Sequence, residues 1–334
     1  MMQVYPGKRQ DLRGLIKLML LWSAGFLVCS CANVSSGASE VAEDVRTIEN
    51  CQFDIQLEAA PERVICIGQH TVELMESLGL EDRILGWCFP DNLPYPSFPI
   101  ISERYPSREV ILELSPDFVF TGYLGSFKAK NIGSREFLSQ LGINSYVSGT
   151  RCLDSIRAIT LNDVFTDYLK LGEIFRVEER AQEIVDSLQQ IIHSMRSDIP
   201  DSSRVSIWVF GGAYSDGAFL SEGGFGLANH LISLSSGQNI FQHIPKQGFE
   251  LNIEQVLSRN PEVILVKQSH ADPGGKASIE YLKNHKSLSE LPAVKEHRFI
   301  TVPSNYLLPG PNCIKALHLL GAEIAKVKHP EHGR

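Results

Sequence analysis

The chain has 334 residues, of which 43% are hydrophobic and 21% are charged. That length is enough for two domains with separate cores, and the composition excludes a chain that is mainly disordered. The formal net charge is −8. An acidic protein of this kind is a poor partner for nucleic acid and for anionic lipid surfaces.

Residues 1–30 have the features of an export signal. Four basic residues come first: Lys8, Arg9, Arg13 and Lys17. The apolar run that follows, residues 18–28, is too short to span a bilayer comfortably. The four residues that end in Cys31 resemble a bacterial lipoprotein signal, which implies that Cys31 is diacylated and becomes the mature N-terminus. Residues 31–45 then have the polar composition of a linker.

Strand and helix patterns alternate through residues 46–172. We predict a short strand or hairpin over 46–58, strands at 63–67, 84–87 and 143–147, and helices at 72–78, 135–141 and 154–171, the last ending at Gly172. Between them lies an irregular loop, residues 89–99, which is rich in proline and aromatic residues. Alternation of this kind favours a parallel sheet with helices on both faces.

One long helix is predicted near the middle of the chain. Residues 177–198 contain neither Gly nor Pro, and apolar residues such as Ala181, Val185 and Leu188 recur at spacings of three and four. This is the stripe that a helix of about six turns buries on one side. We assign residues 173–200 to a helix that joins two lobes, 46–172 and 201–334.

The second half resumes the alternation. We predict a strand at 205–210, a glycine-rich loop to residue 226, a helix to 234, a turn at 237–239, a helix near 279–284, an edge strand at 299–302 and a final helix at 312–326. In parallel sheets ligands bind beyond the carboxyl ends of the strands. Two lobes that face each other then form a ligand cleft between them.

An internal repeat links the two halves. Residues 107–120 and 252–265 align without a gap, and each is predicted to be a helix followed by a strand. Ser107 and Asn252 are suited to cap the two helices, and Glu109 and Glu254 follow two positions later. A carboxylate in a first helical turn is stabilised by the helix dipole, so good capping alone can account for both.

Several segments in order resemble the solute-binding proteins of ABC importers for ferric siderophores, cobalamin and haem. They are PERVICIG, VELMESLGLEDRILG, SREVILELSPDFVF, FLSQLGINSYV, LISLSSGQNIF, IEQVLSRNPEVILV and LPAVKEHRFITV. The resemblance implies two α/β lobes, each with a mostly parallel sheet, joined by one rigid helix with the ligand between them. It also implies docking on an ABC permease through Glu109 and Glu254, and a small opening motion.

Candidate ligand-binding residues follow the predicted strands. A large chelate needs flat apolar walls and a few directed donors, which Tyr, Trp and Arg supply. For any single aromatic residue, packing inside the core of its own lobe is an equal alternative. The candidates are Gln69, His70, Thr71, Trp87, Phe89, Arg104, Tyr105, Tyr123, Tyr214 and Tyr306.

His70 has two interpretations. A neutral imidazole at the start of a helix can occupy an axial position on haem iron or cobalt. A single His after a strand more often caps the helix or makes a hydrogen bond, and no third ligand accompanies His70 and Glu73. We therefore predict no metal site built from the protein alone and no resident cofactor.

Five cysteines follow Cys31: Cys51, Cys66, Cys88, Cys152 and Cys313. Their spacing does not suggest zinc, and an odd number cannot pair completely. Cys66 lies inside a predicted strand and is assigned to the core. For the others the sequence leaves free thiol and disulfide open.

These observations predict an exported, lipid-anchored receptor, monomeric and without catalysis, that delivers an iron-siderophore-type chelate to an ABC permease and its ATPase. A cobalamin or other corrinoid, or haem, is the alternative ligand. The alternatives from other classes are a chelatase-like enzyme acting on a tetrapyrrole and a structural surface lipoprotein. An enzyme needs an acid or base in the cleft, where His70 is the obvious candidate.

Overall fold

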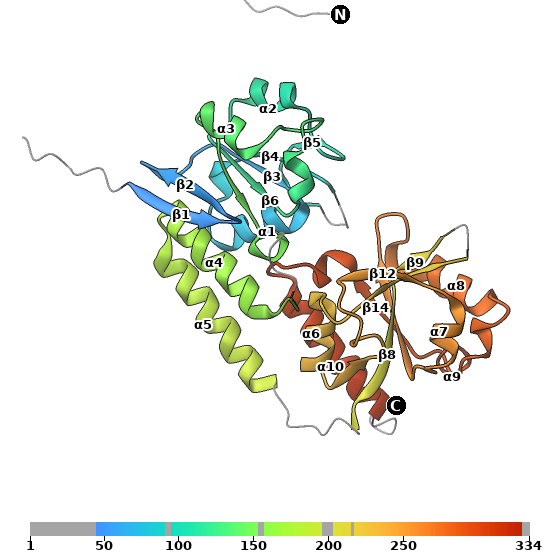
Figure 1. Ribbon diagram of the computed structural model, residues 1–334. Helices are drawn as coiled ribbons and strands as arrows, with labels where there is room; N and C mark the ends of the chain where they lie inside the picture. Colours follow the sequence, from blue (N-terminus) through green and yellow to red (C-terminus); the bar gives the residue numbers. More distant parts are fainter. Residues whose placement is uncertain (1–44, 91–94, 153–156, 196–202, 215–216, 329–334) are drawn as a thin grey trace, which may run out of the picture. The chain divides into compact units, whose positions relative to one another are not determined.

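Two parallel sheets flanked by helices organise the computed structural model, which describes residues 45–90, 95–152, 157–195, 203–214 and 217–328 (Figure 1). Residues 43–334 form one compact unit. The predicted signal peptide, most of the linker and Cys31 lie outside the described residues. Within those residues, every helix is too short or too polar to cross a membrane.

The first lobe contains a five-stranded parallel sheet of order β5-β4-β3-β6-β7. Neighbouring strands pair in parallel throughout, for example Val64 of β3 with Ile84 of β4 and with Phe118 of β6. The strands are β3 Val64–Ile67, β4 Ile84–Cys88, β5 Ile100–Ser102, β6 Phe118–Thr121 and β7 Asn144–Val147. The helices between them are α1 Gln69–Ser77, α2 Arg108–Leu114 and α3 Arg135–Gln140. Before them stands an antiparallel hairpin, β1 Arg46–Asn50 and β2 Phe53–Leu57.

The second lobe contains a four-stranded parallel sheet of order β11-β8-β13-β14. Its strands are β8 Val205–Phe210, β11 Gly237–Asn239, β13 Val263–Gln268 and β14 Phe299–Pro303, and its helices are α6 Leu227–Leu234, α7 Ile253–Leu257, α8 Lys276–Asn284, α9 Pro292–Lys295 and α10 Cys313–Lys328. The predicted parallel α/β fold is confirmed in both lobes.

The repeated unit is present in each lobe. The Ser107 hydroxyl caps α2 by accepting from the amide of Val110, and β6 follows. Asn252 caps α7 in a reciprocal capping box with Gln255, and β13 follows. Glu109 and Glu254 are both exposed, one on each lobe. Because Gln255 completes the box at α7, Glu254 has no part in that cap.

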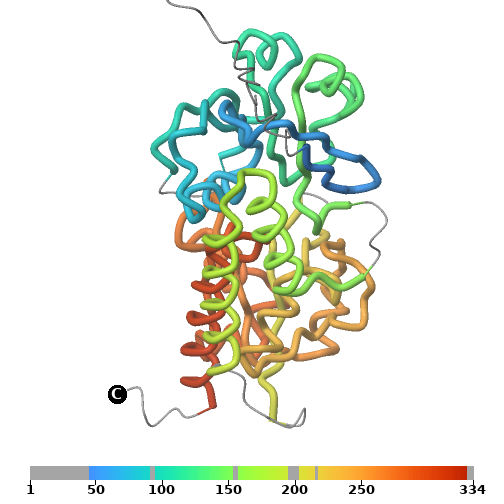
Figure 2. The backbone as a smooth tube through the Cα atoms, turned by 90° about the vertical axis from the view of Figure 1, so that its left-hand side faces the viewer, coloured from blue at the N-terminus to red at the C-terminus, as the bar shows by residue number. Residues whose placement is uncertain are grey.

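A pair of antiparallel helices connects the lobes. They are α4 Leu161–Phe175 and α5 Glu178–Met195, and the second confirms the long helix predicted from the apolar stripe. Both views show α5 extending from the first lobe alongside the second (Figures 1 and 2). The predicted end of the preceding helix at Gly172 is wrong: α4 continues to Phe175, and Arg176 takes the left-handed conformation. A Cβ on Gly172 would lie 2.7 Å from the Cβ of Ala181, so this glycine allows the two helices to pack closely.

Three further predictions of local structure are corrected. Helix α1 begins at Gln69 rather than at Val72, so residues 69–71 form its first turn. The predicted turn at 237–239 is strand β11. The predicted glycine-rich loop contains β9 Gly212–Ala213 and β10 Phe219–Glu222, and β10 pairs with β9 on one side and with β12 Gly248–Leu251 on the other in an antiparallel sheet. Glycine suits this region because the backbone approaches closely there: a Cβ on Gly224 would lie 1.9 Å from the carbonyl oxygen of Gln242.

The hydrophobic cores are less separate than the sequence predicts. One buried cluster contains residues of both sheets, such as Phe118 and Ile207, together with Ala181 of α5 and Leu317 of α10. Each lobe also has a smaller cluster of its own on the other face of its sheet. Because helices α5, α6 and α10 share one apolar interior with both sheets, the two lobes are joined by packing as well as by the chain.

Candidate functional site

Aromatic rings gather at the carboxyl ends of the parallel strands of the first lobe. Phe89 directly follows β4, Tyr123 lies two residues after β6, and Tyr105 precedes α2. The ring centroid of Phe89 lies 4.7 Å from that of Tyr105 and 5.1 Å from that of Tyr123. All three side chains are partly buried, and we call them the aromatic cluster. Partly buried rings of this kind suit a large ligand with flat apolar surface.

The backbone at Phe89 is strained. Its φ angle is +64°, a region that residues other than glycine and asparagine rarely adopt. The amide of Phe89 donates to the carbonyl oxygen of Ser102, at 3.1 Å, across the end of β5. Such conformations persist where the surrounding structure holds them and are concentrated at functional sites. Here the conformation accompanies the contact of the Phe89 ring with the two tyrosines.

His70 lies behind the aromatic cluster. Its ring meets Tyr123 edge-on at 5.7 Å, and its side chain is 1% exposed. Burial lowers the pKa of His70 to about 3, and the positive charge of Arg151 acts in the same direction. The imidazole is therefore neutral, and its Nδ1 is buried without a hydrogen-bond partner. A Cβ on Gly122 would lie 2.0 Å from the His70 Nε2, so a glycine is needed to admit the ring.

Arg151 brings positive charge to the same place. It ends the short 3-10 helix η3, Gly149–Arg151, which follows β7. Its Nη1 donates to the Oε1 of Gln247 in the second lobe at 2.9 Å, whereas its Nε is buried without a partner. Burial raises the pKa of Tyr105, and the charge of Arg151 opposes that rise. Arg151 thus acts electrostatically on both His70 and Tyr105, and it can offer an N–H to an anionic ligand group.

A cavity of about 180 Å³ adjoins Arg151. Across it, Lys267 Nζ pairs with Glu222 Oε1 at 2.6 Å, and both side chains are largely buried. The cavity is lined by residues of both lobes: Arg151, Ile159, Glu222, Gly226, Leu227, Gln247, Gly248, Lys267, Leu307, Leu308 and Pro309. With Lys267 already neutralised by Glu222, Arg151 supplies the uncompensated charge among these lining residues.

A second pocket, of about 430 Å³, lies between α1 and the start of α10. Glu73 of α1 is its central polar group: the Oε1 of Glu73 accepts from Gln69 Nε2 at 3.2 Å and from Asn305 Nδ2 at 3.1 Å, whereas the Oε2 is buried without a partner. Burial raises the pKa of Glu73 to about 7, and these hydrogen bonds only partly offset that rise. Since Asn305 belongs to the second lobe, Glu73 is a contact between the lobes.

Tyr95 makes a further contact between the lobes. Its hydroxyl lies 2.8 Å from Nδ1 of His270, which follows β13, and its ring lies 5.8 Å from that of Trp87. Among the residues that the structure describes, three His, Cys, Asp or Glu side chains do not come together anywhere as a metal site. The arrangement is therefore one of aromatic faces, one guanidinium and polar contacts, which is suited to holding a ligand.

The family model for periplasmic binding proteins matches residues 64–306, which is most of the chain. The chain belongs to this family. Its members are solute-binding proteins of ABC importers for siderophores, vitamin B12 and haem. Membership implies an exported, periplasmic location.

Known proteins resemble this periplasmic binding protein over most of its length. The vitamin B12-binding protein of Vibrio parahaemolyticus is 22% identical over 261 residues, which is 77% of this chain and 86% of the relative. A periplasmic binding protein from Veillonella parvula is 26% identical, with a TM-score of 0.73 over 84% of this chain and 97% of the other. The structure of an ABC-type Fe³⁺-hydroxamate transport system from Saccharomonospora viridis is 24% identical, with a TM-score of 0.68 over 83% and 98%.

The residues predicted from sequence divide into three groups in this binding protein. The aromatic cluster is brought together at the strand ends, and Tyr306 lines the larger pocket. Arg104 and Tyr214 are exposed, and Tyr214 follows β9 in the second lobe. The remaining four are buried: Gln69, His70, Thr71 and Trp87.

Two of these predictions need correction in the structure. Trp87 is 0% exposed and its indole N–H donates to the carbonyl of Phe98 at 3.1 Å, so it is a core residue. The reason is that β4 lies inside the sheet, where the last residues of the strand are covered on both faces. His70 is enclosed in the first turn of α1 against Gly122 and Gly310, and its ring is not open to an axial metal.

Sequence reasoning missed Arg151, Gln247 and Glu73. Arg151 follows the predicted strand 143–147, and the rule that ligands bind beyond strand ends pointed to it as much as to the other candidates. Gln247 lies just before β12, in a stretch between residues 239 and 252 for which the sequence predicts no element, so no pattern marks it. For Glu73 the sequence suggests only a pairing with His70 on one helix face. The pairing of Cys51 with Cys152, left open by the sequence, is a disulfide, and Cys66, Cys88 and Cys313 are buried free thiols.

Proposed function

We propose that this periplasmic binding protein captures a ferric siderophore or a similar anionic metal chelate and delivers it to an ABC permease and its ATPase. The chelate is cargo, and the protein needs no resident cofactor and performs no chemistry on it. The proposal extends the established membership of the family to a ligand class, because the relatives differ in what they are named for.

The observation that carries the proposal is Arg151: burial raises the pKa of Tyr105 in the aromatic cluster, and the positive charge of Arg151 opposes that rise. The cluster offers ring faces to the apolar part of a chelate, and the guanidinium, whose Nε has no partner, offers charge-assisted hydrogen bonds to its oxygens. A ferric complex of catecholate or carboxylate ligands has both kinds of surface. Haem, with two carboxylates on an apolar ring, satisfies the same requirements less fully because its iron also needs an axial ligand.

A corrinoid is the second candidate. The curated relative from Vibrio parahaemolyticus is named a vitamin B12-binding protein, although it is only 22% identical. Cyanocobalamin is uncharged overall, so its binding depends on the aromatic faces and only weakly on Arg151. The two candidates therefore differ in how much they lose when the guanidinium is removed.

Direct binding measurements test the proposal. Tryptophan fluorescence and thermal shift would be followed with a ferric tris-catecholate, a ferric tris-hydroxamate, cyanocobalamin and haemin. If a ferric tris-catecholate binds, Arg151→Ala should weaken its binding by about tenfold or more, since a hydrogen bond to a charged group contributes about 1.5–3 kcal/mol. The matched control is Arg298→Ala, which removes an arginine at the opposite end of the second sheet. A protein that binds none of the four probes would refute the function.

The docking of the permease on Glu109 and Glu254 forms part of the proposal. Both carboxylates are exposed at the start of equivalent helices, one on each lobe. Reversal of both charges, Glu109→Arg with Glu254→Arg, should abolish uptake in cells and leave the affinity for the ligand unchanged. Glu113→Arg, on the exposed side of the same helix α2, is the control that should leave uptake intact. Normal uptake by the double variant would contradict the docking assignment.

The N-terminal anchor and the monomeric state complete the proposal. Lipidation at Cys31 predicts that the mature protein partitions with membranes and that Cys31→Ser releases it into the soluble fraction. A monomer predicts a single species of about 34 kDa in solution once the signal peptide is removed. Sedimentation of the soluble variant measures both the release and the mass.

A further inference from the structure

A disulfide connects the N-terminal hairpin to the segment that bears Arg151. Cys51 lies in the two-residue turn between β1 and β2, where Cys51 and Gln52 have φ angles of +54° and +60°. It is bonded to Cys152, which directly follows Arg151 at the end of η3. The cross-link therefore acts one residue away from Arg151, which lines the cavity of about 180 Å³.

The hairpin is a fixed support rather than a loose arm. The side chain of Asn50 donates to the carbonyl of Val147 and accepts from the amide of the same residue, both at 2.8 Å. Arg135, itself buried, donates from Nη1 to the carbonyl of Asn50 at 2.6 Å. Because the turn is attached to β7 in this way, a bond from Cys51 fixes the position of Cys152 relative to the first sheet.

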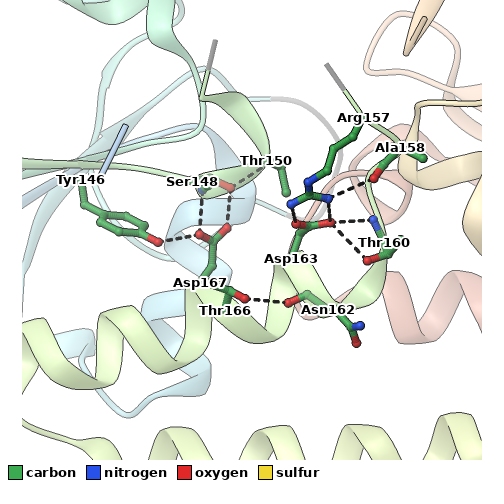
Figure 3. Close-up of polar contacts among 11 residues, drawn as sticks. Tyr146, Ser148, Thr150, Arg157, Ala158, Thr160, Asn162, Asp163, Thr166 and Asp167 are labelled. Carbon is green, nitrogen blue, oxygen red and sulfur yellow. Dashed lines mark hydrogen bonds and ion pairs between the residues drawn. The ribbon is translucent and has the colours of Figure 1, made fainter. Parts of the chain in front are cut away.

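The other end of η3 is held by Asp167 of α4. Its carboxylate accepts from the hydroxyl of Ser148 at 2.5 Å, the amide of Gly149 at 2.7 Å and the hydroxyl of Tyr146 at 2.7 Å. Figure 3 shows this side chain below Ser148, with Tyr146 and Thr150 on either side. Arg151 thus lies between two attachments: Asp167 holds Ser148 and Gly149, which precede it, and the disulfide holds Cys152, which follows it.

We propose that the Cys51–Cys152 disulfide is a positioning element for Arg151, so that the affinity for an anionic ligand depends on the oxidised state of this pair. The inference rests on the proposed function, since it concerns the ligand-facing role of Arg151. An arginine side chain has many rotamers, and it can hold one geometry towards Gln247 and a ligand only if its backbone is fixed. Without the cross-link, the backbone around Arg151 keeps the attachment through Asp167 and loses the one through Cys152.

The chemistry of the switch is thiol–disulfide exchange. A dithiol reductant donates two electrons: the Sγ–Sγ bond breaks, Cys51 and Cys152 become thiols, and the reductant becomes a disulfide. The described free thiols, Cys66, Cys88 and Cys313, are buried, and burial raises the pKa of each. They are therefore poor competitors for this exchange.

The first test is a mutant cycle on the affinity for a ferric tris-catecholate. The variants are Arg151→Ala, the pair Cys51→Ser with Cys152→Ser, and all three changes together. We expect about a tenfold loss from the serine pair and no further loss when Arg151 is already alanine, because the pair acts through that side chain. Losses that multiply would overturn the proposal. Ile300→Ala, a core change in the second lobe, controls for stability and should leave the affinity unchanged.

The second test needs no ligand and covers the case in which no probe binds. Amide hydrogen exchange is compared between the full-length protein as isolated and after treatment with dithiothreitol. We expect faster exchange at residues 149–152 and around Gln247 after reduction, since the contact between the lobes loosens. Faster exchange confined to the hairpin, residues 46–57, would overturn the proposal. Because this result is independent of any ligand, it separates failure of the positioning role from failure of the proposed function.

Discussion

Replacement of Glu73 by Gln should change how the stability of the protein depends on pH. Burial raises the pKa of the Glu73 carboxyl from 4.5 to about 7, so the folded protein holds this proton more tightly than the unfolded chain. Well below pH 4.5 the carboxyl is protonated in both states, and its burial then causes no pH-dependent loss in the free energy of unfolding. As the pH rises from 4.5 to about 7, the unfolded chain gives up this proton before the folded protein does, so stability is lost progressively over that window and the loss is nearly complete above pH 7.

The magnitude follows from the difference between the two pKa values. A difference of about 2.5 pH units corresponds to about 3 kcal/mol of unfolding free energy, at about 1.36 kcal/mol per unit. Glu73→Gln keeps the acceptor for Gln69 and Asn305 but cannot ionise. The free energy of unfolding of the wild type should therefore decrease relative to that of the variant by up to about 3 kcal/mol between pH 5 and pH 8.

Urea unfolding at pH 5, 6, 7 and 8, followed by tryptophan fluorescence, measures this difference. Other groups titrate in the same range, such as Asp167, whose pKa burial raises to about 6, but they are common to both proteins and cancel in the comparison. Glu76→Gln, one turn along α1, is the control: burial raises its pKa in the same direction, but the group is more exposed and its effect should be smaller. A difference between wild type and Glu73→Gln that does not vary with pH would refute the reasoning.

Two further substitutions test how the site is packed. Gly122→Ala places a Cβ 2.0 Å from Nε2 of His70, so the buried ring must move, and the midpoint of unfolding should fall by the equivalent of about 1–3 kcal/mol; an unchanged melting temperature would contradict the enclosed position of His70. Asn50→Ala removes both hydrogen bonds to Val147 and should cost about 1–3 kcal/mol in denaturant unfolding, whereas Asn144→Ala, which loses one exposed bond, should cost less than half as much.

The candidate site was only partly accessible from the sequence. Phe89, Tyr105 and Tyr123 follow or precede predicted strands, and the strand-end rule was enough to group them. The same rule also selected Trp87, which the structure buries, because a rule about chain position does not distinguish a side chain pointing out of a sheet from one inside it. Arg151 was overlooked, although it stands in an equivalent place after β7.

Cross-lobe contacts lay beyond any sequence pattern. The hydrogen bond from Arg151 to Gln247 joins residues 96 positions apart, and the bond from Asn305 to Glu73 joins residues 232 positions apart. The pairing of Cys51 with Cys152 likewise depends on the hairpin lying against the end of β7. Such contacts are set by the order of strands within each sheet and by the packing of α10 against both lobes, neither of which local periodicity encodes.

The sequence by itself determined the alternation of strands and helices, the long helix α5 and the repeat of helix and strand in each lobe. These features depend on caps, on the spacing of apolar residues and on prolines, all of which act within a few residues. Tertiary structure alone decided which polar groups became buried and which cysteines paired. It also brought Arg151 to the aromatic cluster, because burial and convergence arise only when distant segments exclude water together.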